Sequence, residues 1–480
     1  MTDRPSLDPA DWRAFRALAH RMLDCALDHA EGAAERPVWR PTPEATRAAL
    51  CTAPPWEGEG ADAAAETVLT HILPYPTGNT HPRFFGWVHG AGTPGAMIAE
   101  VMAAAMNSNL GGRDHAANLV ESQVIDWMKR VFGFPDGASG LVLSGTSMAT
   151  LIAIISARAK MAGRDIRREG ARQGEAPLVG YTSTEGHSCI ARCFDQIGLG
   201  TDALRLVPVR DDFTMDTSRL RAMITADRAA GAQPFCVIGA AATVNTAATD
   251  DLSALADICA EEGLWFHVDG AFGAVAALSE RLKPRLAGIE RADSIAFDFH
   301  KWMHVQYDAG CVLVRDGASH LGAFAHGADY LSGMPRGLGA AKPWFSDYGV
   351  ELSRGFRALK VWFTLKEHGL RRLGEKVEDN VAQAAHLGRL VDAAHDLERL
   401  APVSLNIVCF RYAPDGFDGD LDALNREIVM DLQESGIAAP STTMIRGRAA
   451  IRVNITNHRT RLADMDILVG AIQRIGARRV

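Results

Sequence analysis

The sequence predicts an α/β protein with a central, mostly parallel sheet, a smaller C-terminal α+β domain and a helical N-terminal segment. The chain has 480 residues, too many for one hydrophobic core, since single cores stop growing near about 250–300 residues. From about residue 86, near-continuous apolar runs alternate with helical patterns, which is typical of parallel strands covered on both faces. After about residue 366 helices and strands continue in a shorter α+β order. We therefore expect three parts, 1–85, 86–365 and 366–480.

The N-terminal part is predicted to be helical but not to fold alone. Asp8 and Pro9 look like an N-cap followed by proline in the first helical turn, and apolar residues recur at helical spacing from Trp12 to Ala26. Many prolines follow. We expect this open segment to pack on something else, such as a second subunit.

In the central part, "GLVLSGTSMATLIAIISARAK" indicates a strand, a turn and a helix, and "PFCVIGAAATVNTAATDDLSALADICAEEG" indicates a strand, a loop and a helix. "LWFHVDGAFGA" is a further strand. In such sheets ligands bind beyond the carboxyl ends of the strands. The C-terminal part is predicted to contain helices over 377–394 and 421–432 and strands in "VSLNIVCFRY" and "AAIRVNITN".

Composition excludes several classes of protein. The net charge is −8 and no basic run occurs, so a nucleic-acid surface is not expected. The first residues lack a signal-peptide pattern, and no apolar run is long enough to span a bilayer. The eight cysteines include no CxxC pair, so we expect neither disulfides nor a metal site but buried thiols in a reducing cytoplasm.

Lys301 stands in the apolar context "ADSIAFDFHKWMHVQYDAGCVLVRD", which we interpret as a pair of core strands. Lysine is rarely buried without a partner or a reaction. A deprotonated lysine forms a Schiff base with an aldehyde, and partial burial favours the neutral amine by lowering its pKa. Pyridoxal phosphate is the aldehyde cofactor that uses such a lysine. It also requires a carboxylate for its ring nitrogen and a cradle for its phosphate.

Asp269 is the candidate carboxylate, because it ends the apolar run "LWFHVD" and so lies at the carboxyl end of a buried strand. A protonated ring nitrogen would offset the cost of burying it. The small residues Gly270, Ala271 and Gly273 leave room for a flat ring. An aspartate that only caps the next turn is the alternative.

Thr146 and Ser147 are the phosphate candidates, since "SGTSMAT" runs directly into an apolar helix and helix N-termini bind anions. A simple helix cap is the alternative. His187 in "YTSTEGHSCIARC" follows a short strand, and its ring could stack on the cofactor or be structural.

With these motifs the chain resembles the pyridoxal-phosphate-dependent group II amino-acid decarboxylases, and among them the aromatic-L-amino-acid decarboxylases. "HPRFFGW", "SGTSMAT", "GHSCIARC", "WFHVDGAFGA", "ADSIAFDFHKW" and "LSRGFRALKVW" carry the resemblance along nearly the whole chain. It implies fold type I, the pyridoxal-phosphate-dependent transferase-like fold, with a swapped N-terminal segment. It also implies a homodimer with the active site at the subunit interface.

The resemblance also implies a role for each matching residue. Lys301 would carry the cofactor and Asp269 would bind its ring nitrogen, with His187 and Ala271 on the two faces of the ring. The phosphate would be held by Thr146, Ser147 and His300, and the substrate side chain would lie near Trp87 and His89.

Two departures from the family pattern stand out. The family commonly has Asn-Pro before the His-Lys pair, where this chain has Asp298-Phe299. Because an aspartate would repel a phosphate, we expect Asp298 to point elsewhere. The second departure is Phe345, which aligns with the loop tyrosine that protonates the carbanion in the family, although Tyr348 or Tyr330 could serve instead.

The predicted activity is therefore decarboxylation of an aromatic L-amino acid to its amine. If Phe345 occupies the donor position, the alternative is an aldehyde synthase, in which the intermediate meets oxygen. A non-aromatic substrate such as glutamate stays open. A catalytically silent binding protein would require a damaged lysine or aspartate motif, and both motifs are intact.

Overall fold

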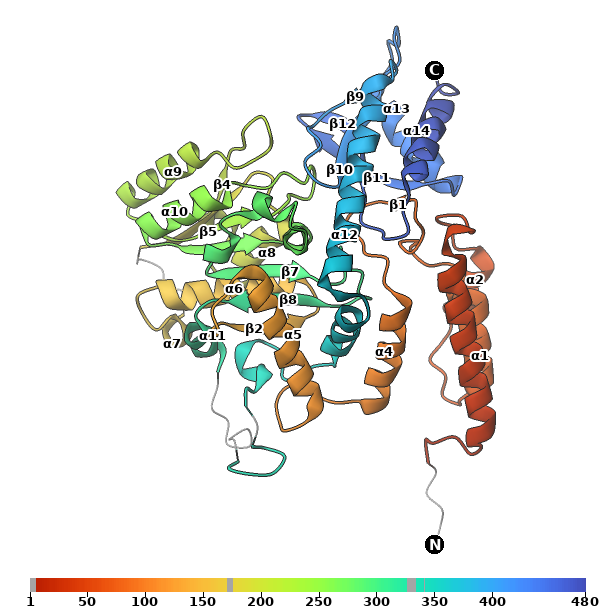
Figure 1. Cartoon of the computed structure of the whole chain (residues 1–480), viewed down its shortest axis with the longest axis horizontal. Coiled ribbons are helices and arrows are strands. Elements are labelled where there is room, and N and C mark those ends of the chain that lie inside the picture. The colour runs from red at the N-terminus through yellow and green to blue at the C-terminus, as the bar shows by residue number, and fades with distance from the viewer. Residues whose placement is uncertain (1–5, 171–175, 326–333, 341) are drawn as a thin grey trace.

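The computed structural model describes residues 6–170, 176–325, 334–340 and 342–480. Within these ranges the chain forms a large α/β body, a smaller sheet with its own helices, and an N-terminal group of helices beside them (Figure 1). Among the described residues, no helix combines the length and the apolar composition needed to cross a membrane.

In the described chain, seven strands form the large sheet in the order β2-β8-β7-β6-β5-β3-β4. β8 is antiparallel to both of its neighbours, and every pair from β7 to β4 is parallel. This confirms the predicted α/β fold with a mostly parallel sheet. The strands are β2 (Ser139–Leu143), β3 (Leu178–Ser183), β4 (Leu204–Val207), β5 (Gln233–Ala240), β6 (Trp265–Asp269), β7 (Ser294–Asp298) and β8 (Gly310–Val314).

Helices cover the large sheet on both faces, so every residue of β6, β7 and β8 is buried. The apolar runs in the sequence reflect this burial. The helices of this body are α4 (Pro94–Met106), α5 (Ala116–Phe132), α6 (Thr146–Met161), α7 (Ile166–Glu169), α8 (Ser188–Gln196), α9 (Thr217–Ala229), α10 (Leu252–Glu262) and α11 (Gly317–Phe324).

The small sheet has the order β1-β11-β12-β10-β9 within the described residues. Its first strand comes from the N-terminal part, because Phe84 and Phe85 pair in parallel with Ala439 and Pro440. Three of its strands were not predicted, since β1 and β9 are short and β11 mixes apolar and hydroxyl residues. The elements are β1 (Phe84–Phe85), β9 (Leu397–Arg399), β10 (Ile407–Tyr412), β11 (Ala439–Ile445), β12 (Arg448–Asn454), α13 (Leu421–Glu434) and α14 (Leu462–Gly476).

Two predicted helix starts were wrong. α12 (Arg357–Ala393) begins well before residue 377 and contains a kink at Gly369, which has φ 72° and ψ 156°. The predicted domain boundary at residue 366 therefore lies inside α12, and the three-part division remains a prediction. α1 (Trp12–Glu31) is capped by Asp11, whose side chain accepts from two backbone N–H groups, and not by Asp8. Two short helices, α2 (Glu44–Leu50) and α3 (Ala61–Thr67), follow α1.

Two buried histidines make the stability of this fold depend on pH. Burial lowers the pKa of His267 to about 3 and that of His320 to about 4, although each Nδ1 lies 2.8 Å from a serine hydroxyl. The unfolded chain, with an ordinary histidine pKa near 6.5, binds protons first as the pH falls. Stability is therefore full above about pH 6.5 and decreases toward pH 4, by roughly 1.4 kcal/mol per pH unit for each histidine.

Urea unfolding at pH 7, 5.5 and 4.5 checks this dependence. We expect His320→Asn to give a smaller decrease in unfolding free energy between pH 7 and pH 4.5 than the wild type. His20→Asn, at an exposed position of α1, is the matched control and should keep the wild-type decrease. Identical pH profiles for wild type and His320→Asn would contradict the assignment.

Candidate active site

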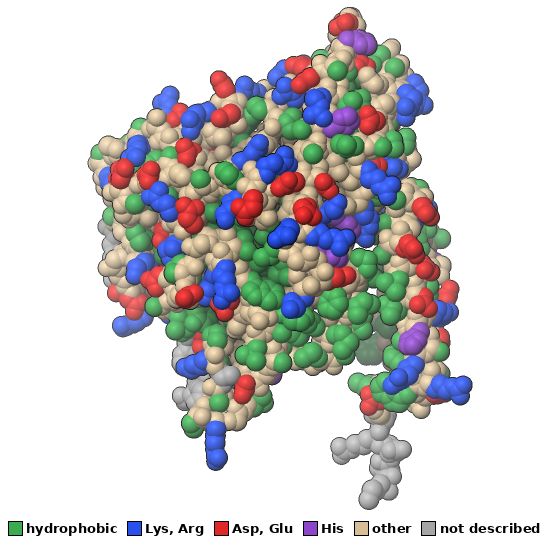
Figure 2. Space-filling view, in the orientation of Figure 1, with side chains coloured by type: hydrophobic (Ala, Val, Ile, Leu, Met, Phe, Trp, Pro, Cys, Tyr) green, Lys and Arg blue, Asp and Glu red, His purple; other side chains and the backbone are tan. Residues whose placement is uncertain are grey.

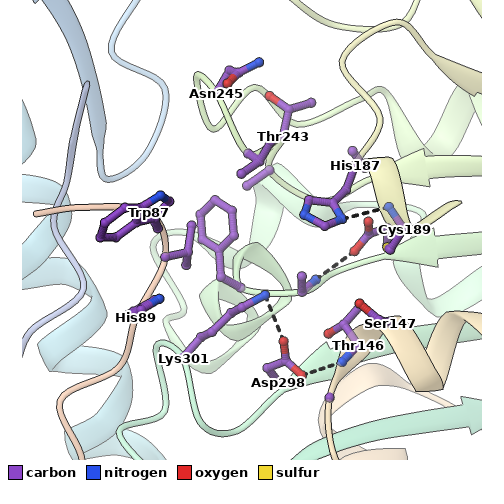
Figure 3. A pocket seen from close by; sticks show the side chains of 18 of the residues that line it. Trp87, His89, Thr146, Ser147, His187, Cys189, Thr243, Asn245, Asp298 and Lys301 are labelled. Carbon is purple, nitrogen blue, oxygen red and sulfur yellow. Dashed lines mark hydrogen bonds and ion pairs between the residues drawn. The ribbon is translucent and has the colours of Figure 1, made fainter. Parts of the chain in front are cut away.

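The carboxyl ends of β2, β3, β5, β6 and β7 meet at one edge of the large sheet and surround a pocket of about 610 Å³ (Figure 3). Parallel strands place their carboxyl ends on the same side, which is where open α/β sheets bind ligands. The pocket brings together most of the predicted site residues. They are Trp87, His89, Thr146, Ser147, His187, Asp269, Ala271, His300 and Lys301.

Lys301 lies in the loop that follows β7, and not within a strand as the sequence suggested. Its Nζ is 2.9 Å from Oδ2 of Asp298 (Figure 3). Burial alone would lower the pKa of Lys301, but the attraction of Asp298 and Asp269 outweighs burial and raises it above the ordinary value. The expectation of a lowered pKa was therefore wrong, because it overlooked the neighbouring carboxylates.

Asp298 points into the pocket, which contradicts the expectation that it points away. Its Oδ1 accepts a hydrogen bond of 2.7 Å from the backbone N–H of Thr146, the first residue of α6. Gly310 permits this approach, since a Cβ there would lie 2.6 Å from Oδ1 of Asp298 and 2.5 Å from the Cα of Gly145. The buried carboxylate thus joins the start of α6 to Lys301.

Asp269 ends β6 and is buried, as its position in the apolar run predicted. Its Oδ1 accepts from the backbone N–H of Ala271 at 3.1 Å. Burial raises the pKa of Asp269, while His187, the Ala271 N–H and Lys301 favour its charged form. A cationic group placed in the pocket beside this carboxylate would be strongly stabilised by it.

The other predicted polar residues come from the ends of β2, β3 and β7. His187 caps α8, with Nδ1 accepting from the N–H of Cys189 at 3.2 Å, and its ring faces the pocket (Figure 3). Thr146 and Ser147 begin α6, and Oγ1 of Thr146 is buried with no hydrogen-bond partner among the described residues. Burial lowers the pKa of His300, whose Nδ1 accepts from the N–H of Ala309.

Trp87 and His89 form the opposite wall of the pocket (Figure 3). Their rings are stacked with centroids 5.8 Å apart. Trp87 has φ 49°, a left-handed conformation that is costly for a bulky residue and persists only where the surroundings impose it. Arg452 contributes to that support by donating to the carbonyl oxygen of Trp87 at 2.8 Å.

Sequence reasoning missed a polar chain at the rim of the pocket. Asn245 donates to Oε2 of Glu185 at 3.0 Å and accepts from Oγ1 of Thr443 at 2.8 Å. Glu185 could have been noticed, since it lies two residues before His187. Thr443 belongs to the unpredicted strand β11, and no local pattern marks its side chain as part of this pocket.

Two of the loop candidates, Phe345 and Tyr348, lie outside this pocket. Phe345 is 2% exposed and lies under the guanidinium of Arg354, 5.2 Å from its ring centroid. The ring of Tyr348 packs against His320 at 5.1 Å. Neither residue lines the pocket of its own chain, and Tyr330 lies outside the described residues.

These groups fit pyridoxal phosphate. A lysine amine, a buried carboxylate and a helix N-terminus with an unpartnered hydroxyl surround one pocket, and they match the aldehyde, the ring nitrogen and the phosphate. The fold and this set of groups define a pyridoxal-phosphate-dependent enzyme.

The chain belongs to the pyridoxal-dependent decarboxylase family, because the model of the pyridoxal-dependent decarboxylase conserved domain matches residues 43–413. It is therefore a pyridoxal-phosphate-dependent amino-acid decarboxylase, as the sequence motifs predicted.

Similar proteins include decarboxylases of different amino acids. The chain is 31% identical to an aromatic-L-amino-acid decarboxylase of Bacillus atrophaeus, over 94% of this chain and 93% of the relative. It is 29% identical to a histidine decarboxylase of Drosophila melanogaster, over 95% of this chain and 54% of that protein. The crystal structure of Oryza sativa TDC with PLP and tryptamine superposes with a TM-score of 0.89 at 25% identity, covering 99% of this chain and 100% of that chain.

Proposed function

We propose that this decarboxylase converts an aromatic L-amino acid to the corresponding amine. The observation that carries the proposal is the stacked wall of Trp87 and His89, of which Trp87 is 56% exposed within the chain. An exposed indole beside a pocket offers an aromatic side chain a favourable stacking surface. The aromatic-L-amino-acid decarboxylase at 31% identity supports the same class of substrate.

The family resemblance suggests the proposed roles, and the positions of these side chains around one pocket support them. Lys301 is the covalent attachment point, and Asp269 holds the proton on the ring nitrogen. His187 and Ala271 contact the two faces of the ring. The bound cofactor supplies an electron sink for the carbanion that remains when CO₂ leaves. The phosphate is held at the start of α6 by Thr146, Ser147 and His300.

The apolar surface supports the predicted homodimer. Only Leu18 of the twenty residues of α1 is buried, and Val101, Met102 and Met106 of α4 are each about half exposed. Hydrophobic side chains gather between α4 and α1 in the lower part of the molecule (Figure 2). Exposed apolar patches of this kind mark protein interfaces. Sedimentation equilibrium should therefore give twice the chain mass of 51.6 kDa, and a monomer at micromolar concentration would count against the dimer.

Buried free thiols support the predicted cytoplasmic location, where the reducing environment keeps cysteines reduced. They are those of Cys189, Cys193, Cys236, Cys259, Cys311 and Cys409.

A product assay tests the proposed activity. The purified, cofactor-loaded enzyme is incubated separately with tryptophan, tyrosine, phenylalanine, histidine and glutamate, and amine, aldehyde, CO₂ and peroxide are measured together. We expect the highest kcat/KM for an aromatic amino acid, with one amine formed per CO₂. Equimolar aldehyde and peroxide would support the aldehyde synthase instead, and preferred turnover of glutamate would contradict the aromatic proposal.

Phe345→Tyr tests whether position 345 controls the product. Because Phe345 packs beneath Arg354 in the core, we expect the added hydroxyl to lower stability by about 1–3 kcal/mol and to leave the ratio of peroxide to amine unchanged. Tyr348→Phe is the matched variant of the same loop and should affect both quantities little. A shift from aldehyde to amine in Phe345→Tyr would instead place residue 345 at the reacting carbon.

A further inference from the structure

Asp298 is the residue of this site whose contacts the predicted roles do not explain. One carboxylate oxygen accepts from the first N–H of α6, and the other pairs with the amine of Lys301. Its side chain is 2% exposed, so solvent screens these contacts little. The carboxylate of Asp298 therefore lies beside the start of α6, where the cofactor phosphate is proposed to bind.

We propose that Asp298 is a positioning residue that holds Lys301 as an ammonium ion and occupies the first amide of α6, so that it slows covalent attachment of the cofactor and weakens binding of its phosphate. This inference rests on the proposed role of Lys301 as the attachment point. It adds an assignment for a carboxylate that the family resemblance left without one.

Lys301 attaches the cofactor slowly while its amine is held as an ammonium ion. Condensation with an aldehyde needs the nitrogen lone pair, which an ammonium ion lacks. From the ammonium form, one proton goes to solvent, a C=N bond forms, and the aldehyde oxygen leaves as water with the two remaining hydrogens. Asp298 stabilises the ammonium through a contact of 2.9 Å, and so reduces the reactive fraction at a given pH.

The negative charge of Asp298 also weakens binding of the cofactor phosphate. A phosphate at the start of α6 would meet a carboxylate where one N–H is already taken. Ser147 and the unpartnered hydroxyl of Thr146 remain as donors, while Asp298 repels the phosphate in a poorly screened pocket. Other titratable groups also interact with this pair. Lys301 interacts with Asp269, Cys189, His89 and His300, and Asp298 interacts with Asp269, His300, Tyr307 and Cys311.

Asp298→Asn tests both effects, because the amide oxygen can still accept from Thr146 while the charge is lost. Cofactor-free protein is mixed with pyridoxal 5′-phosphate, and attachment is followed by the change in cofactor absorbance from pH 6.5 to 9. We expect attachment at least about tenfold faster than in wild type at pH 7.5, with the whole rate profile moved to lower pH, since tenfold corresponds to about one pKa unit. Pyridoxine 5′-phosphate, which has no aldehyde, should also bind more tightly.

The controls separate this inference from the proposed function. Asp308→Asn removes a carboxylate of the same loop that pairs with Arg357 and not with Lys301, and its attachment rate should stay at the wild-type value. If Asp298→Asn fails to fold, Asp298→Ser provides the test, since its hydroxyl can accept from the same N–H. Borohydride labelling of a residue other than Lys301 would overturn the proposed function itself. The role of Asp298 alone would be overturned by a different result. In that result Lys301 is labelled, but Asp298→Asn and Asp298→Ser keep the wild-type attachment rate and the wild-type affinity for pyridoxine 5′-phosphate.

Discussion

Replacing Lys301 by alanine should lower the turnover number by at least about a thousandfold, which corresponds to about 4 kcal/mol of transition-state stabilisation. The covalent attachment point of the cofactor is lost, and the buried carboxylate of Asp298 loses the amine 2.9 Å away. The wild-type protein should be yellow, and borohydride reduction should fix the cofactor to the peptide that contains Lys301. Mass spectrometry of the digested protein locates the label.

Lys301→Arg is the matched control for the charge. It keeps a cation beside Asp298 but cannot condense with an aldehyde under these conditions. We expect this variant to unfold near the wild-type temperature and yet to remain as inactive as Lys301→Ala. Substantial turnover by either variant, or a label on another lysine, would remove Lys301 from the chemistry.

Asp269→Asn should reduce turnover by roughly a hundredfold or more, which is about 2.7 kcal/mol. The amide preserves the shape of the side chain and its contact with the Ala271 N–H, but it has no charge to hold a proton on the ring nitrogen. The electron sink is weaker without that proton. Cofactor binding should weaken as well, which a spectral titration with pyridoxal 5′-phosphate measures independently of turnover.

Asp250→Asn is the matched control, since Asp250 is also a buried carboxylate at the large sheet and lies outside the pocket. Its oxygens accept from the N–H groups of Met215 and Ala240, and burial raises its pKa to about 6. We expect this variant to change stability while kcat and the cofactor spectrum stay close to wild type. Near-normal turnover in Asp269→Asn would place that carboxylate away from the ring.

The pattern of the sequence determined the large sheet and much of the site. Apolar runs that end in Asp269, or that lead into Thr146, mark buried strands of the large sheet and the segments after them. Because these strands point the same way, the residues at their carboxyl ends meet at one edge whatever the details of packing. The lysine and aspartate motifs could therefore be assigned to one pocket before any contact was known.

Tertiary structure alone decided the contacts between segments far apart in the chain. Pairing of Phe84 with Ala439 and the support of Trp87 by Arg452 join residues that no local pattern connects. Tertiary structure also decided the position of Phe345. Its alignment suggested a catalytic position, but its apolar ring is buried beneath Arg354, where removal from water stabilises it. Asp298 was predicted to avoid the phosphate site on charge alone. The N–H of Thr146, which has no partner within α6, and the amine of Lys301 stabilise a buried carboxylate there. The loops after β2 and β7 bring these two donors together, and no local pattern in the sequence shows that they meet.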